Sequence, residues 1–212
     1  MYKTYVMHYS PLCERRGFIL NQLSSAGISQ FELVTEFDRE DLTHEDLSRY
    51  NDDPDFHRQV CEISRQPHGF AGLTPYTYQK MTLASISLNL KHLESFNRFI
   101  NQEVEFALFL EDDCSFYGHP FDINDIINRA PHDWDVILLG GAFDHGIITP
   151  LAVYGDMDKG YILASHPATN TTSSIIYNKQ SAKKIVPYLE TFCGGVYCWF
   201  YMRVVNEAFP EI

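Results

Sequence analysis

Four consecutive apolar residues, Ala107 to Leu110, run directly into three acidic residues, Glu111, Asp112 and Asp113. An uninterrupted apolar run of this length is typical of a strand that is buried on both faces, as in an α/β sheet. Three adjacent carboxylates repel one another, and burying them without partners is costly. A divalent cation that prefers oxygen ligands, Mg²⁺ or Mn²⁺, would compensate this charge. The stretch therefore predicts either a metal site for a phosphorylated ligand at the carboxyl end of a strand, or an acidic turn that water solvates.

Strand-like and helix-like segments alternate along most of the chain. The first unit is a strand, a helix that ends at Gly27 and a second strand, an order that favours a parallel pair. This alternation predicts one α/β domain of 212 residues, a three-layer α/β/α arrangement with a central, mostly parallel (mixed) sheet. Residues 38–72 are polar and turn-rich, and we expect loops with short helices there. The expected strands are 5–7, 31–34, 106–110, 136–139 and 173–177, and the expected helices are 14–26, 75–102, 123–129, 179–189 and 199–212.

Charge and composition limit the partners and the compartment. A net charge of −12, from 16 basic and 28 acidic residues, argues against nucleic acid or an anionic membrane as the main partner. No apolar run approaches the roughly 20 residues that span a bilayer, and the first residues lack the apolar core of a secretory signal. Five scattered cysteines without CxxC spacing are typical of reduced thiols rather than of a zinc site. These features predict a cytoplasmic protein without an integral membrane segment.

Taken in order, these segments resemble the nucleotide-sugar glycosyltransferases of the GT-A type, in particular the lipopolysaccharide-type and collagen-type galactosyltransferase family. Lys91 replaces the serine of a Ser-His pair that this family carries on its central helix. The chain is also similar in sequence and length to the amino-terminal glycosyltransferase domain of a multidomain chlorovirus protein that builds capsid glycans. The matching segments are Tyr5-Val6-Met7-His8, Glu14-Arg15-Arg16, Leu90-Lys91-His92, Ala107 to Asp113, Trp134 to Gly140 and Thr172 to Tyr177.

The resemblance implies a metal-dependent glycosyltransferase that moves a hexose or deoxyhexose from a UDP-sugar to a glycan acceptor, in viral or surface glycan synthesis. UDP-glucose or UDP-galactose is the donor expected from the family, and a deoxysugar donor such as UDP-rhamnose stays open. The nucleotide-sugar-binding part is expected over about 1–115 and the acceptor-side part over about 116–212. A viral enzyme of this kind would work in the host cytoplasm, and further domains of the same polypeptide are expected beyond a domain cut.

The resemblance also implies roles for single residues. Asp113 is the expected direct ligand of Mn²⁺ or Mg²⁺, with Glu111 and His166 as further candidate ligands. Asp144 and Asp156 are the candidates for a catalytic base, and either an inverting or a retaining course stays open. The residues expected to bind the nucleotide sugar are His8, Tyr9, Ser10, Arg15, Arg16, Thr35, Lys91, Glu111 and Asp112.

Simpler interpretations compete with several of these assignments. Packing at a strand end accounts equally well for His8 and Tyr9, and a solvated helix face accounts for one of the two arginines. Asp38 could complete the base pocket together with Thr35 and Glu36, but a solvated loop is its expected place. A satisfied, partly buried histidine is the commoner account of His92.

Two other functions stay open. The first is a nucleotidyltransferase or phosphohydrolase with an acidic metal site, although the chain has no GxxxxGK[ST] phosphate loop. The second is a non-catalytic module that binds a nucleotide sugar. The segment 193–199 supports this second function, because it has no carboxylate where the family commonly carries one near its final helix.

Overall fold

A mixed five-stranded sheet forms the centre of the protein, with the strand order β2-β1-β3-β7-β4. The computed structural model describes residues 1–48, 82–116, 122–130, 134–139, 153–156, 161–164 and 173–191. Strands β2, β1 and β3 are parallel, whereas β7 runs antiparallel to both β3 and β4. The mixed α/β class is therefore as expected. The strands are β1 (Tyr2–Met7), β2 (Phe31–Val34), β3 (Phe106–Glu111), β4 (Val136–Leu138) and β7 (Ser174–Asn178).

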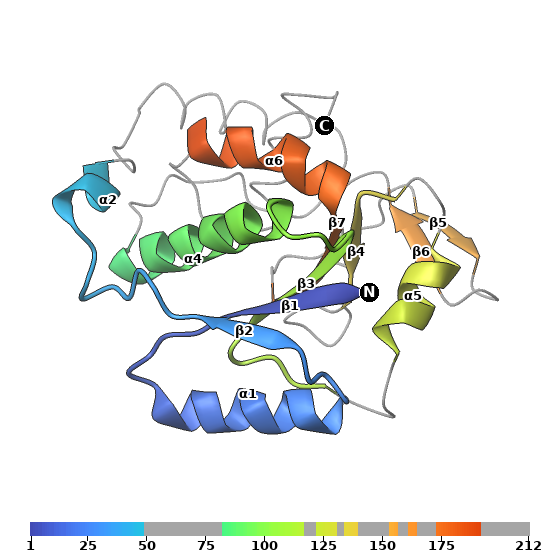
Figure 1. Ribbon diagram of the computed structural model, residues 1–212, viewed down its shortest axis with the longest axis horizontal. Helices are drawn as coiled ribbons and strands as arrows, with labels where there is room; N and C mark the ends of the chain where they lie inside the picture. The colour runs from blue at the N-terminus through green and yellow to red at the C-terminus, as the bar shows by residue number, and fades with distance from the viewer. Residues whose placement is uncertain are drawn as a thin grey trace.

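Helices cover both faces of this sheet, which makes three layers (Figure 1). One face carries α1 and α5, and the opposite face carries α4 and α6, which contact each other. The short helix α2 follows the second strand, and two further strands, β5 and β6, form a separate antiparallel pair. The bounds of these elements are α1 (Cys13–Ser25), α2 (His44–Ser48), α4 (Leu83–Ile100), α5 (Ile123–Arg129), α6 (Lys179–Thr191), β5 (Val153–Asp156) and β6 (Tyr161–Ala164).

The central strands alternate their side chains between two apolar cores. Phe109 of β3 faces α4 and α6, where its ring lies 4.6 Å from that of Phe96 and 5.1 Å from that of Tyr177 between centroids. Its neighbours Leu108 and Leu110 face α1 and α5. Helices cover both faces, so β3 is apolar at successive positions. This burial explains the run that precedes the acidic triplet.

The helix after β1 ends where the sequence predicts, at Gly27. This glycine has a φ of +71°, and its amide donates to the carbonyl of Ser24. The next amide, that of Ile28, donates to the carbonyl of Leu23. This pair of bonds is the Schellman arrangement, which places a left-handed residue just after a helix. It turns the chain back into β2.

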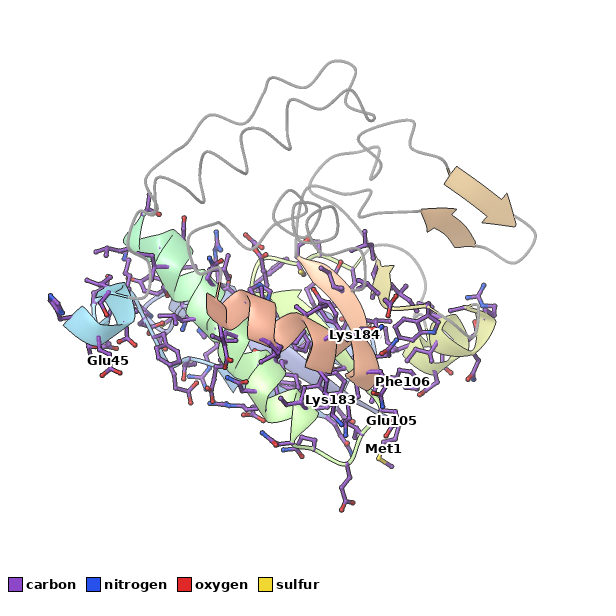
Figure 2. The ribbon with its side chains drawn as sticks, turned by 90° about the horizontal axis from the view of Figure 1, so that it is seen from above. Met1, Glu45, Glu105, Phe106, Lys183 and Lys184 are labelled. Carbon is purple, nitrogen blue, oxygen red and sulfur yellow. The ribbon has the colours of Figure 1, made fainter. Side chains whose placement is uncertain are left out.

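Three parallel strands end at the same edge of the sheet. Met7, the last residue of β1, is in register with Val34 on one side and with Glu111 on the other. This carboxyl edge is opposite the edge where Met1, Glu105 and Phe106 lie together (Figure 2). The chain moves from β1 to one neighbour, β2, and later returns to the other side of β1 as β3. Ligands of open α/β sheets bind at such a switch point.

Several element boundaries differ from the expected ones. β1 begins at Tyr2 rather than residue 5, because residues 2–4 are in register with 106–108 of β3 despite their polar character. The hairpin of β5 and β6 was not expected from the sequence. The start of the predicted 75–102 helix and the whole predicted 199–212 helix lie outside the described residues. In the described ranges, none of the helices has the length and apolar character of a membrane span.

Candidate functional site

The segments that follow β1, β2 and β3 meet at the carboxyl edge and bring together charged residues from distant parts of the sequence. Residues 8–15 follow β1, residues 35–40 follow β2, and Asp112 and Asp113 follow β3. α4 contributes Lys91 from the face of the sheet that it covers. Four of the expected ligand-binding residues, His8, Tyr9, Arg15 and Asp112, are in direct contact here.

Asp112 is buried, and its carboxylate is fully engaged inside the protein. Its Oδ2 accepts hydrogen bonds from His8 Nδ1 at 2.8 Å and from the amide of Tyr9 at 3.2 Å. Its Oδ1 accepts from Arg15 Nη1 at 3.0 Å. Together these bonds join the end of β3 to the end of β1 and to the first turn of α1. Asp112 therefore stabilises the arrangement of these three segments.

Asp113 faces solvent, in contrast to Asp112. Its side chain is 53% exposed, and its Oδ2 lies 3.2 Å from the same Arg15 Nη1. Glu111, the last residue of β3, is half-buried. The hydrogen bond to Asp112, reinforced by the charge of Asp113, raises the pKa of Arg15 above its ordinary value. Arg15 is thus a permanent cation that bridges a buried and an exposed carboxylate.

The donor set fits a hard divalent cation in its chemistry. Carboxylate oxygens suit Mg²⁺ and Mn²⁺, and Mg²⁺ is commonly held by one or two carboxylates together with phosphate oxygens of a substrate. Among the residues that the structure describes, no group of three histidine, cysteine, aspartate or glutamate side chains converges on one point. Asp113, whose side chain is exposed, would be one ligand of such a cation.

Asp38 is buried, so the expectation that it lies in a solvated loop is wrong. Its Oδ1 lies 2.8 Å from Nζ of Lys91, and its Oδ2 accepts from the amide of Ser10 at 3.2 Å. Lys91 also donates to the carbonyl of Glu36 at 2.7 Å. Burial lowers the pKa of Lys91, and the hydrogen bond to Asp38 opposes this shift. Between the two acceptors lies Phe37, whose φ of +63° is unusual for a non-glycine residue.

Two buried carboxylates therefore fix the loop after β1. The amide of Tyr9 donates to Asp112 and that of Ser10 donates to Asp38. The ring of Tyr9 is held as well, because its hydroxyl donates to Glu40 at 2.5 Å and the guanidinium of Arg39 lies 4.8 Å from the ring centroid. The half-buried Tyr9 is thus a preorganised aromatic surface at the switch point.

His92 occupies a different environment from Lys91, although the two are adjacent in α4. Its ring is buried and lies 6.3 Å from that of Phe109 between centroids. Burial lowers the pKa of His92 to about 3, so the imidazole is neutral near pH 7. Lys91 reaches the carboxyl edge from this helix through its contact with Asp38.

The remaining expected residues are less informative. Arg16 is exposed on α1, and Thr35 is half-buried directly after β2, where its amide hydrogen-bonds to the side chain of Glu36. Asp156 is the last residue of β5, and only its backbone is described. Asp144 and His166 lie outside the described residues.

Sequence reasoning missed Phe37 at this edge, and it favoured a solvated loop for Asp38 over a place in the binding pocket. A buried lysine needs an acidic partner, but the sequence around Lys91 is mixed and does not show that this lysine is buried. No local signal pointed to the left-handed backbone of Phe37.

A pocket of about 210 Å³ lies at the opposite, amino-terminal edge of the sheet. It is open and is lined in part by the exposed Met1 and by Asn124 at the start of α5. The buried polar pairs His8–Asp112 and Lys91–Asp38 are at the other edge, so we place the candidate site there and not in this pocket.

No protein-family model matches the chain, and no curated protein matches it either. The fold and the site together define an α/β protein with a candidate ligand site at the switch point of its sheet.

Proposed function

We propose that the protein is a metal-dependent glycosyltransferase of the GT-A type, which moves a hexose or deoxyhexose from a UDP-sugar to a glycan acceptor. The main observation behind this proposal is the position of Glu111, Asp112 and Asp113 at the switch point. Asp112 is buried and hydrogen-bonded inside the protein, whereas Asp113 faces solvent. A purely solvated acidic turn has no need of a buried, three-donor carboxylate in its middle.

In this proposal, each group at the edge has a separate task. Asp113 holds a Mn²⁺ or Mg²⁺ ion, which when bound neutralises the charge that grows on the leaving diphosphate. Arg15 donates hydrogen bonds to the diphosphate, for which its planar guanidinium is well suited. Tyr9 offers its ring to the nucleoside, and Glu111 contacts the ribose or the sugar. The buried Asp112 and Asp38 keep these groups in place through the loop after β1.

The wider context is part of the same proposal. We propose that the acceptor is a viral or cell-surface glycan, that the protein is cytoplasmic, and that further domains of a longer polypeptide accompany it. Asp144 and Asp156 stay the candidates for the catalytic base on the acceptor side.

A second candidate function is a module that binds a nucleotide sugar without cleaving it. The ion pairs of Arg15 with Asp112 and Asp113 favour this candidate, because the guanidinium already neutralises part of the acidic charge without a metal. Binding of a UDP-sugar without release of UDP would identify it.

The test is a thermal-shift panel of UDP-, GDP- and CDP-sugars with and without Mn²⁺, followed by an assay for UDP release. A ligand at about 100 times its dissociation constant stabilises the folded state by about 2.7 kcal/mol. We expect a Mn²⁺-dependent shift with a UDP-sugar that disappears in Asp113→Asn. Asp125→Asn is the matched control, because the Asp125 side chain is 57% exposed, is paired with Arg129 and lies on α5. An unchanged shift and unchanged turnover in Asp113→Asn would refute the metal role, and pyrophosphate release from a nucleoside triphosphate would indicate a nucleotidyltransferase.

A further inference from the structure

We propose that Arg15 is a built-in counter-cation that competes with the divalent cation for Asp113, and that cation binding releases its guanidinium from Asp113, so that it can meet the diphosphate while it stays bonded to Asp112. The inference rests on the proposed metal site. It adds an energetic coupling between Arg15 and Asp113, which the proposed function treats as independent.

The geometry places one nitrogen between two carboxylates. Nη1 of Arg15 lies 3.0 Å from Oδ1 of Asp112 and 3.2 Å from Oδ2 of Asp113. These are the two residues of the triplet that follow the end of β3, so the guanidinium covers the acidic edge itself.

The two contacts of Arg15 differ in strength. The Asp112 side chain is 7% exposed, and His8 and Tyr9 hold its carboxylate in a fixed orientation. The Asp113 side chain is 53% exposed, and water can replace the guanidinium there. Ion pairs of exposed side chains contribute little to stability, whereas charged hydrogen bonds to buried groups contribute more. The contact with Asp113 is therefore the one that a competing cation breaks.

Competition follows from charge. A guanidinium and a divalent cation on the same carboxylate repel each other, so each lowers the affinity of Asp113 for the other. Coupling of this kind is reciprocal, and whatever removes Arg15 from Asp113 must tighten cation binding. The Arg15 side chain is 44% exposed, so its guanidinium can turn toward an anionic ligand without leaving a buried position.

Arg16 provides a matched control for this inference. It carries the same charge at the next position of α1, is exposed, and makes no ion pair with another residue that the structure describes. A general effect of net charge on cation binding would therefore be equal for Arg15 and Arg16, whereas competition at Asp113 is specific to Arg15.

The experiment measures Mn²⁺ binding to the full chain in the absence of nucleotide, from the electron paramagnetic resonance signal of free aqueous Mn²⁺. An exposed ion pair contributes about 0.2–1 kcal/mol, so Arg15→Gln should bind Mn²⁺ about 1.4- to 5-fold more tightly than the wild type. Arg16→Gln should match the wild type. At saturating Mn²⁺, Arg15→Gln should bind UDP more weakly than the wild type, because the diphosphate loses a donor.

Equal Mn²⁺ affinities in the wild type and Arg15→Gln would overturn the competition and leave the metal site intact. Equal tightening in Arg15→Gln and Arg16→Gln would overturn it as well, in favour of a general charge effect. Failure of every variant and of the wild type to bind Mn²⁺ would instead overturn the proposed metal site, and the inference with it.

Arg15→Gln also removes a partner of the buried Asp112, so a measurement on the wild type keeps the test decisive if this variant does not fold. The arginine Nε–Hε signals are followed by NMR during a Mg²⁺ titration. We expect one arginine signal to shift with the same dissociation constant as Mg²⁺ binding. Mg²⁺ binding without a shift of any arginine signal would refute the competition.

Discussion

Replacing Lys91 by methionine should strongly destabilise the fold. Lys91 and Asp38 are both buried, with side chains 3% and 8% exposed, and their charged atoms lie 2.8 Å apart. Methionine has a similar length, so the change leaves no large cavity. It leaves the Asp38 carboxylate buried with the amide of Ser10 as a neutral donor, and it removes the donor to the carbonyl of Glu36. Breaking one partner of a buried pair costs about 3–5 kcal/mol, a large part of the 5–15 kcal/mol that is typical for a domain.

Urea unfolding at pH 7 of the wild type, Lys91→Met, Asp38→Asn and the double variant measures this free energy and its coupling. We expect each single variant to lose about 3 kcal/mol or more, and the double variant to lose less than the sum by about 2 kcal/mol. The control is Lys183→Met, a substitution of an exposed lysine on α6 (Figure 2). A surface substitution of this kind should change the stability by no more than about 0.5 kcal/mol.

Two results would refute the reasoning about this pair. The first is a loss below about 1 kcal/mol in Lys91→Met, which would mean that water or another cation compensates Asp38. The second is strict additivity in the double variant, which would mean that the two side chains act separately. A change in the denaturant slope m would instead indicate that the substitution alters the denatured state.

Two further predictions concern a buried histidine and a turn. Because burial lowers the pKa of His92 to about 3, the unfolded chain binds one more proton than the folded one between about pH 3 and pH 6.5, and the free energy of unfolding falls as the pH falls through this window. His92→Gln should reduce the pH dependence of the free energy of unfolding by up to about 1.4 kcal/mol per pH unit. Urea unfolding at several pH values between 4.5 and 7 measures this dependence, and the same dependence in the variant and the wild type would contradict the prediction. Gly27→Ala should cost about 1 kcal/mol of stability, because Gly27 has a φ of +71°, which is unfavourable for alanine. The cost is conformational and not steric, since no heavy atom lies within 4 Å of an added Cβ. An unchanged stability in thermal unfolding would show that the turn relaxes.

The elements that the sequence predicted well are those with a clear local pattern of apolar residues. β2 and α5 have the predicted bounds, and β3 differs by one residue at its end. The polar residues 2–4 extend β1 because pairing with β3 stabilises them, and this long-range effect leaves no local pattern. The strands of the β5 and β6 hairpin pair locally, but they have only four residues each, and Gly155 interrupts the apolar pattern of the first.

The candidate site, too, could be predicted from the sequence only in part. The acidic triplet after β3 could be placed at the carboxyl edge from the sequence, because strand direction fixes the edge. The different environments of Asp112 and Asp113 could not, since the two residues are chemically identical neighbours. His8 and Arg15, 104 and 97 positions away from Asp112, determine which of the two is buried. Lys91 determines the burial of Asp38 in the same manner.

The location of the buried polar pairs is itself an argument for a functional edge. Within the described ranges, His8–Asp112 and Lys91–Asp38 are the pairs in which both side chains are less than a tenth exposed, and both lie at the carboxyl ends of the parallel strands. Burying polar and charged side chains is costly, and apolar replacements of buried pairs are often neutral or stabilising, so stability alone does not explain these two buried pairs at one edge. Each pair instead fixes an amide of the loop after β1, at Tyr9 and at Ser10. A loop held in this way keeps Tyr9, Arg15 and Asp113 in one arrangement before a ligand arrives, and this preorganisation is what a binding site at a switch point requires.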